Sequence, residues 1–530
     1  MSPVEVRIAV VREEAPSAIN IWSPKMFTTR QDSKWLSIFE SNRRPRRSTS
    51  RKVHSHGAVI AMAIASLSIA GPMPGWAQSD APISKDIRLV GSHPLQARSA
   101  YQVHPHRYPD GRYMLFVGHH SDQMTNSQTG EIEENGTSIV DVTDPETPVY
   151  LKHVPGVAGA QMAAACNGAE LPNGNPNKVY LLRSNGNLEH QVWDVSDPVN
   201  PVLLSTPQTG LESTHRNWWQ CDTGIAYIIS DLRQFGWSTN RGLQVFDLSD
   251  PAKPSLIRNF ALPGMEPGGQ GDYYQPNGIH EATVSQDGSK VYLAYGTGAK
   301  GVIQILDNES LLKGDPSLED PYAETFSNLL YPQLGRLDMP EHWGAHTVFS
   351  LGRIPVHYDR KFQIGATREI LVVASESRAN ECLEAHHAVS ILDYTDGVHP
   401  YPISTYRVRD ESIDFCERGG RFGTHNVGSS YHEPLYPGFI VVAYFNAGVR
   451  VVDVRDPFHP KEIAFYIPAI TENTAARCVM VDGKERCKTA IQTNIVEVDD
   501  RGLIYLSDRA NTGVHIVELT GAAEALVEGR

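Results

Sequence analysis

The stretch HQVWDVSDPVNPVLLSTPQTG (residues 190–210) decides the fold, because copies of it recur along the whole chain. Self-similarity at this spacing is the mark of a repeat architecture. Three close and three looser copies share its alternating apolar residues, and they begin at Thr137, Gly242, Gly448, Gly301, Ala388 and Gly513. The chain therefore contains seven related units.

Each unit has the pattern of antiparallel strands joined by tight turns. The alternating V-x-V-x-D run predicts a strand. The following D-P-x-x-P predicts a turn, because the aspartate accepts backbone N–H groups and proline cannot continue a strand. A hairpin precedes each copy, for example with its turn at Asp287 and Gly288. Seven four-stranded sheets that must bury their faces on one another predict an all-β, seven-bladed β-propeller, with a pair of β-sandwiches as the alternative.

The two ends of the repeat region predict how the ring closes. The last copy, GVHIVELTG from Gly513, is followed by no outer strand. The segment KDIRLVGSHPL (residues 85–95) is similar to the outer strands of the other copies. We therefore expect an N-terminal strand to complete the last blade, a propeller over residues 85–521 and a short tail over 522–530. A β-sandwich pair does not predict this similarity.

The first 77 residues differ from the repeats. A basic segment, a short apolar run and small residues ending at Ala77 follow one another. This order predicts a secretory signal peptide at residues 49–77, and a membrane anchor is the alternative. Residues 1–48 are interpreted as a disordered or mis-assigned extension. We expect a periplasmic or secreted protein with no membrane span after signal removal.

The six cysteines fit an oxidising compartment. Cys478 and Cys487 flank a predicted hairpin and are expected to form a local disulfide. Weaker pairings join Cys166 with Cys221 and Cys382 with Cys416. The alternative is that these cysteines are free thiols in the core.

Units of the form V-x-D-V-[ST]-D-P-x-x-P resemble those of the LVIVD-repeat family of secreted or periplasmic β-propellers. The resemblance extends over residues 85 to 521. It implies a propeller fold and a location outside the cytoplasm. It implies little about activity, which depends on the site rather than on the fold.

Histidines recur at the same step of the first strand of several units. First strands line the central channel of a propeller, so residues in register share one ring around the axis. The last unit has Asn494 there, and the second unit has no histidine, with Gln161 or Asn167 nearest. His106 is the other choice in the first unit. The predicted ring consists of His104, His215, His280, His346 and His425.

Clustered neutral imidazoles are ligands for copper, iron or zinc. We therefore predict a transition-metal site in the channel, with copper or iron favoured and zinc possible. The alternative is that each histidine is a structural residue bonded to backbone. Glu281, next to His280, and Glu341, just before His346, are candidates for acid–base catalysis.

These residues predict a metal-dependent oxidoreductase acting on a small molecule in the central channel, with hydrolysis less favoured. The alternative is a non-catalytic propeller that binds a protein partner or a surface through one face. The chain has 47 Lys and Arg against 61 Asp and Glu, a net charge of -14. This charge argues against nucleic acid as a partner.

Overall fold

The computed structural model describes residues 81–271, 276–355, 367–409 and 412–529. The predicted extension (1–48) and signal peptide (49–77) lie outside the described residues, so both stay predictions. No helix of the described part is long and apolar enough to cross a membrane.

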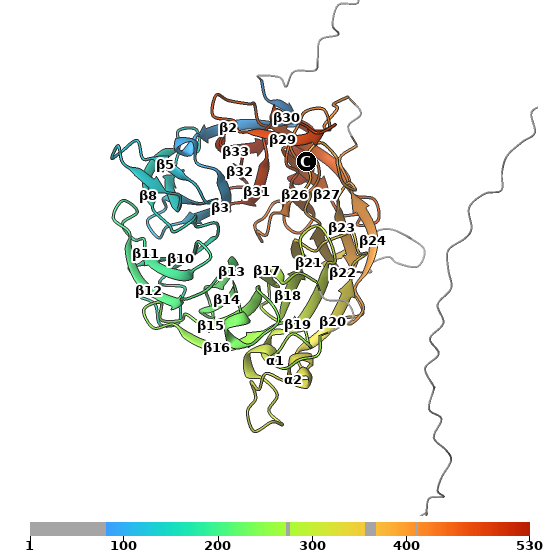
Figure 1. The fold of residues 1–530 in the computed structure, drawn as a ribbon. Coiled ribbons are helices and arrows are strands. Elements are labelled where there is room, and N and C mark those ends of the chain that lie inside the picture. Colours follow the sequence, from blue (N-terminus) through green and yellow to red (C-terminus); the bar gives the residue numbers. More distant parts are fainter. Residues whose placement is uncertain (1–80, 272–275, 356–366, 410–411, 530) are drawn as a thin grey trace, which may run out of the picture. The chain divides into compact units, whose positions relative to one another are not determined.

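Seven antiparallel sheets surround a common centre, which confirms the predicted seven-bladed propeller (Figure 1). The strands of blades one to three, from innermost to outermost, are β3 (Ala100–Arg107), β4 (Tyr113–His119), β7 (Thr137–Asp141) and β8 (Val149–Val154); β9 (Ala163–Asn167), β10 (Val179–Asn185), β11 (Glu189–Asp194) and β12 (Val202–Gln208); and β13 (Thr214–Gln220), β14 (Ile225–Ser230), β15 (Gly242–Asp247) and β16 (Ser255–Phe260).

Blades four to seven follow the same order. Their strands are β17 (Ile279–Val284), β18 (Lys290–Tyr295), β19 (Val302–Asp307) and β20 (Gln333–Asp338); β21 (Thr347–Pro355), β22 (Thr367–Ala374), β23 (Val389–Asp393) and β24 (Tyr401–Tyr406); β25 (Asn426–Val427), β26 (Phe439–Ala443), β27 (Val449–Asp453) and β28 (Lys461–Ile467); and β31 (Thr493–Val498), β32 (Ile504–Asp508), β33 (Gly513–Leu519) and β2 (Ile87–His93).

The closing strand is the one that the sequence predicts. β2 pairs antiparallel with β33, with Ile87 opposite Leu519 and His93 opposite Val514. This segment thus completes the last blade as its outermost strand. A shorter strand, β1 (Ile83–Lys85), adds a fifth strand to blade six by pairing with β28. The helix α3 (Gly521–Val527) lies within the predicted tail.

The repeated turn has the predicted chemistry. The Oδ1 atoms of Asp144, Asp197 and Asp250 each accept a hydrogen bond from the backbone N–H two residues on, at 3.1 Å. The core lies between neighbouring blades. Phe116 and Ile139 of blade one, for example, belong to one buried cluster with Val179 and Leu181 of blade two. The apolar face of one blade therefore buries that of the next.

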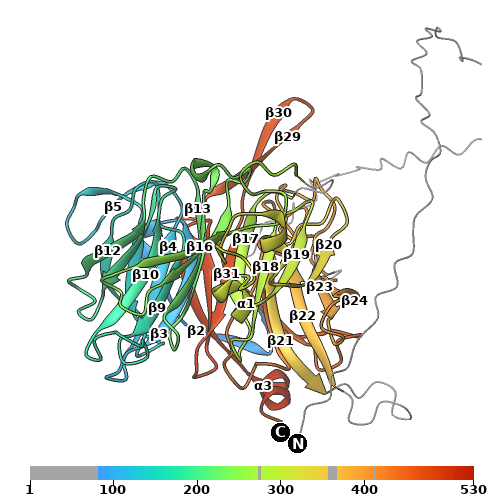
Figure 2. The same cartoon turned by 90° about the horizontal axis from the view of Figure 1, so that it is seen from below.

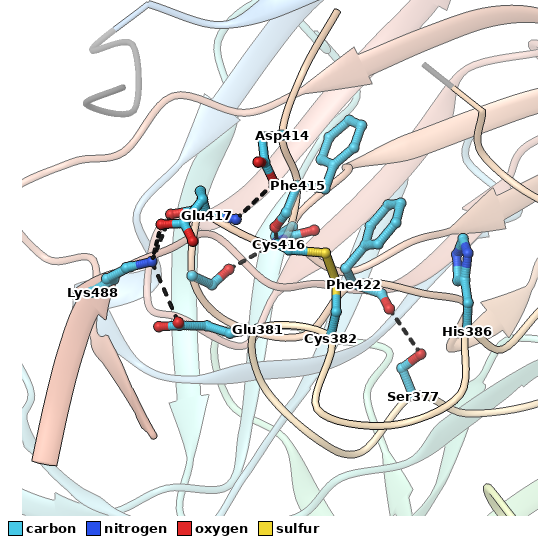
Figure 3. The surroundings of a disulfide bond; sticks show 12 residues. Ser377, Glu381, Cys382, His386, Asp414, Phe415, Cys416, Glu417, Phe422 and Lys488 are labelled. Atoms are coloured by element: carbon cyan, nitrogen blue, oxygen red, sulfur yellow. Dashed lines mark hydrogen bonds and ion pairs between the residues drawn. A yellow bond between two sulfur atoms is a disulfide. The ribbon is translucent and has the colours of Figure 1, made fainter. Parts of the chain in front are cut away.

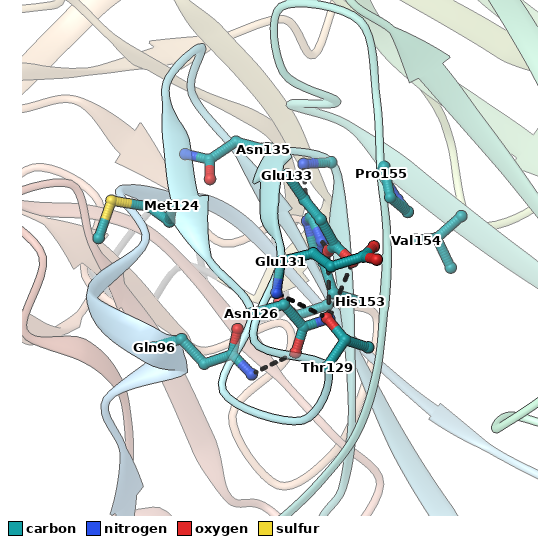
Figure 4. A network of polar contacts seen from close by, with 12 residues as sticks. Gln96, Met124, Asn126, Thr129, Glu131, Glu133, Asn135, His153, Val154 and Pro155 are labelled. Atoms are coloured by element: carbon teal, nitrogen blue, oxygen red, sulfur yellow. Dashed lines mark hydrogen bonds and ion pairs between the residues drawn. The ribbon is translucent and has the colours of Figure 1, made fainter.

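Short elements lie in the connections between strands, some within a blade and some between blades. They are the 3-10 turns at Leu95–Ala97 and Arg233–Phe235, the helices α1 (Asn308–Lys313) and α2 (Phe326–Leu330), and two hairpins formed by β5 (Gln123–Thr125) with β6 (Ile132–Glu134) and by β29 (Ala476–Val481) with β30 (Lys484–Thr489). Figure 4 shows how the first hairpin is held to blade one. Glu133 accepts hydrogen bonds from Asn126 at 3.1 Å and pairs with Nδ1 of His153 at 2.7 Å.

All three predicted disulfides are present. Cys166–Cys221 joins the innermost strand of blade two to the end of β13 in blade three, and Cys382–Cys416 joins two loops. Beside this second bridge, Lys488 of β30 contacts both Glu381 and Glu417 (Figure 3). Cys478–Cys487 crosses the hairpin β29–β30, which projects from one face of the propeller (Figure 2).

The position of the hairpin disulfide leads to a prediction. We expect Cys478→Ser with Cys487→Ser to change the free energy of unfolding by less than about 1 kcal/mol, because the hairpin can open locally without unfolding a blade. Trypsin should instead cut the hairpin faster, at the exposed Lys484. Urea unfolding and limited proteolysis measure the two effects. In the matched variant, Cys166→Ser with Cys221→Ser, the free energy of unfolding should fall by about 2–4 kcal/mol. Equal losses in both variants would contradict this prediction.

Candidate metal centre and axial cavity

Four of the five predicted histidines lie together at the innermost strands of blades three to six. The ring centroids are 4.0 Å apart for His215 and His280, 3.7 Å for His280 and His346, and 4.3 Å for His346 and His425. All four side chains are buried. We call these four residues the histidine cluster. The alignment of first strands thus correctly predicted that these four residues lie together, although His215 and His425 are 210 positions apart in the sequence.

The structure places His104 elsewhere. Its Nε2 accepts a hydrogen bond from the backbone N–H of Ala165 at 3.1 Å, and its ring stacks on His106 at 6.2 Å. Tyr101 stands beside the cluster instead, with its ring centroid 6.0 Å from that of His215 and 5.9 Å from that of His425.

A shift in strand register explains this difference. The pairing of β3 with β4 is irregular between Ala100 and Val103, and that of β13 with β14 is irregular between Thr214 and Asn217. Such bulges turn one side chain away from the ladder. Tyr101 and His215 occupy equivalent bulges, whereas His104 lies on the regular strand beyond. The predicted ring residue was located by counting residues back from the second strand of each blade. This count gives the wrong residue in blade one, because the strand length beyond the bulge differs between blades.

Hydrogen bonds fix which ring nitrogens carry protons. Nδ1 of His280 lies 3.1 Å from the carbonyl oxygen of His346, and Nδ1 of His425 lies 2.5 Å from that of Asn494. Carbonyl oxygens only accept, so these two Nδ1 atoms donate, and the lone pair of each neutral ring is on Nε2. Nδ1 of His346 contacts the Thr347 hydroxyl at 2.9 Å, and its buried Nε2 has no partner among the described residues. Oriented in this way, an imidazole is prepared to bind a metal through Nε2.

The closest contact in the cluster joins two of these nitrogens. Nε2 of His215 lies 2.5 Å from Nε2 of His280, and 3.5 Å from the Tyr101 hydroxyl. Two lone pairs would repel at this distance, so Nε2 of His215 carries a proton and donates it to Nε2 of His280. Nδ1 of His215 is buried and has no partner among the described residues.

Burial keeps the cluster neutral. It lowers the pKa of His215, His280, His346 and His425 well below the ordinary value, and nearby cationic groups lower it further. Neutral imidazole is the form that binds metals. The four rings therefore have the donor type and the charge state that transition metals bind.

The histidine cluster is not a closed set of three ligands. Among the described residues, only Cys478, Glu485 and Cys487 bring three ligand atoms within 4.8 Å of one another, and the two cysteines form a disulfide. The cluster instead offers a facing pair, His215 and His280, with His346 and His425 as neighbours. No three of the four imidazoles bring ligand nitrogens within 4.8 Å of one another in the described part of the chain.

The residues that follow the facing pair form an ion pair. Arg216 contacts Glu281 through Nη1 and Oε1, and their side chains are 5% and 2% exposed. Oε2 of Glu281 also accepts the backbone N–H of Val348 at 3.3 Å. Glu281, a predicted acid–base group, is thus held by its neighbours. Glu341 is exposed on the loop before His346, and among the described residues no hydrogen bond or ion pair joins its side chain to the cluster.

A cavity of about 430 Å³ lies along the innermost strands, next to the Arg216–Glu281 pair. Its lining includes Trp218, Tyr431 and Glu497. Burial raises the pKa of Glu497, whose Oε2 accepts the Ser430 hydroxyl at 2.7 Å. Sequence reasoning missed Tyr101 and Glu497. The register could have indicated Glu497, because it lies three residues beyond Asn494 on the same strand.

Comparison with known protein families gives one match, which covers a short part of the chain. The LVIVD repeat matches residues 238–261, which hold β15 and β16. This match and the seven blades fit the LVIVD-repeat family of propellers. No curated protein matches the chain. A similar solved structure is Chaetomium thermophilum Sqt1 bound to the N-terminus of the ribosomal protein L10, with 13% identity, a TM-score of 0.44 and coverage of 81% of this chain and 99% of that one.

Proposed function

We propose that this protein is an exported, metal-dependent oxidoreductase that acts on a small molecule. The observation that supports it is the meeting of four buried, neutral imidazoles from four consecutive blades, with Nδ1 of His280 and His425 tied to backbone carbonyls. All-nitrogen ligation favours copper or iron, and zinc is possible. The bound metal would supply the redox chemistry.

The residues of the chain have separate roles in this proposal. His215 and His280 would hold the ion, with His346 and His425 as further ligands. Tyr101, whose hydroxyl lies 3.5 Å from Nε2 of His215, would orient that ring or exclude water from it. Glu281 would position Arg216 rather than transfer protons, because it is already occupied by Arg216 and the backbone of Val348.

Metal analysis of protein purified without chelator tests the proposal. We expect close to one equivalent of copper or iron per chain, measured by inductively coupled plasma mass spectrometry. The variant His280→Ala with His346→Ala should lose about nine-tenths of it, because only two of the four imidazoles would remain to bind the ion.

A matched control removes a buried histidine outside the cluster. His190 is fully buried and its Nε2 contacts the carbonyl oxygen of Ile229 at 3.2 Å, so His190→Ala disturbs a blade without touching the axis. This variant should keep its metal. A wild-type protein that binds no copper, iron or zinc after reconstitution would overturn the proposal and favour a non-catalytic binding propeller.

A further inference from the structure

The axial cavity contains buried polar atoms that have no partner. Nε and Nη2 of Arg216 and the indole nitrogen of Trp219 are buried and form no hydrogen bond with a described residue. Both residues lie on β13 and line the cavity, and Trp219 also packs in the buried cluster between blades two and three. Buried polar groups are nearly always satisfied in folded proteins. A concentration of unsatisfied donors at one cavity therefore points to a ligand.

Arg216 offers the most specific of these groups. Its Nη1 is engaged by Glu281, which leaves the edge formed by Nε and Nη2 free. That edge presents two parallel N–H donors, the geometry that matches the two oxygens of a carboxylate. The side chain is 5% exposed, so a bound carboxylate would be shielded from competing water.

The rest of the lining favours a flat apolar body. The rings of Trp218 and Tyr431 lie edge to face, with centroids 6.3 Å apart. Small side chains complete the wall, namely Ala163, Ala164, Ala165 and Ala282. A volume of about 430 Å³ lies within the range of small-molecule sites. An aromatic ring fits such a wall, because aromatic pairs favour stacked or edge-on contact.

The other titratable groups of the cavity do not oppose an anion strongly. Burial lowers the pKa of His104 to about 3 and also lowers that of His106, so both rings are neutral. Burial raises the pKa of Glu497, and its Oε2 accepts hydrogen bonds from the Ser430 hydroxyl and the backbone N–H of Ser429. Glu281 is paired with Arg216, and Glu170 is exposed at the rim of the cavity. His432 also lines the cavity.

We propose that the axial cavity binds a small aromatic carboxylate, with the carboxylate on the free edge of Arg216 and the ring against Trp218 and Tyr431. The site stands on residues of blades three, four and six and does not depend on a metal in the histidine cluster. It would be the substrate site if the proposed oxidoreductase function holds.

Calorimetric titration of the whole exported chain with benzoate, and with its uncharged analogue benzamide, tests the proposal. We expect saturable binding of benzoate at one site and at least about tenfold weaker binding of benzamide, which cannot accept both N–H donors of Arg216. Protein treated with EDTA should bind benzoate equally well. That arm separates failure of this site from failure of the proposed metal function.

Two cavity variants and one control localise the site. Arg216→Lys keeps a cation beside Glu281 but removes the two-donor edge, and it should weaken benzoate binding about tenfold. Trp218→Leu should also weaken it, and this variant serves if Arg216→Lys does not fold. Arg258→Lys is the control, because Arg258 is 3% exposed, also has unpartnered Nε and Nη2 atoms, and does not line the cavity.

Three results would overturn the proposal. They are the absence of saturable benzoate binding up to about 10 mM, equal binding of benzamide, and equal weakening by Arg258→Lys and the cavity variants.

Discussion

Replacing Arg216 with methionine is expected to lower the free energy of unfolding by about 3–5 kcal/mol, because Glu281 would be left buried without its partner. The carboxylate of Glu281 is 2% exposed and lies between the innermost strands of blades three and five. Urea unfolding at neutral pH measures the loss. The double variant Arg216→Met with Glu281→Met should lose less than Arg216→Met alone, since no buried charge remains.

An exposed ion pair provides the control for this experiment. Arg88 of β2 contacts Glu518 of β33, with side chains 54% and 34% exposed. Arg88→Met should cost less than about 1 kcal/mol, because water already solvates both charges. A loss for Arg216→Met as small as that for Arg88→Met would show that Glu281 reaches solvent or takes up a proton when its partner is removed.

Acid is expected to destabilise the propeller well before its carboxylates titrate. Burial lowers the pKa of His190 and His515 to about 4 and that of His104 to about 3. In the unfolded chain these rings take up protons below about pH 6.5, whereas in the folded chain they stay neutral. The unfolded state therefore binds more protons, so stability is complete above pH 6.5 and falls as the pH decreases. Each of these rings is expected to lower the free energy of unfolding by about 3 kcal/mol between pH 7 and pH 4.

Unfolding free energies measured from pH 7 to pH 4.5 test this dependence. His190→Gln should reduce the slope by about one proton in the lower half of the range, because the amide does not titrate there. His399→Gln is the control, since the side chain of His399 is 80% exposed. An unchanged slope in His190→Gln would contradict the prediction.

Much of the fold could be predicted from the sequence because each blade repeats the same local rules. The turn aspartates, the alternating strands and the unpaired last copy are all local patterns, and they specify seven blades and a closing strand. The disulfide partners Cys166 and Cys221 could also be proposed, because both occupy the end of an innermost strand region in adjacent blades. The chain start at residues 1–77 stays a prediction.

The site was predicted less completely. Periodicity identified His215, His280, His346 and His425, since equivalent strands place equivalent residues around one axis. Periodicity predicted the wrong residue for the first blade. Tyr101 occupies the bulge beside the histidine cluster, and His104 lies beyond it on the same strand. A bulge depends on how two strands pair, and the sequence of one strand does not show where the pairing shifts.

The sequence by itself determined a ring of seven related sheets, closed by its own N-terminal strand, with histidines on the inner strands. Only the tertiary structure decided that two of these histidines face each other through Nε2, that Arg216 engages Glu281 of the next blade, and that the other edge of Arg216 is left free in a cavity. The physical reason is distance along the chain. Repeats encode where each strand lies, whereas contacts across the axis depend on side-chain rotamers set by neighbours about 65 residues away.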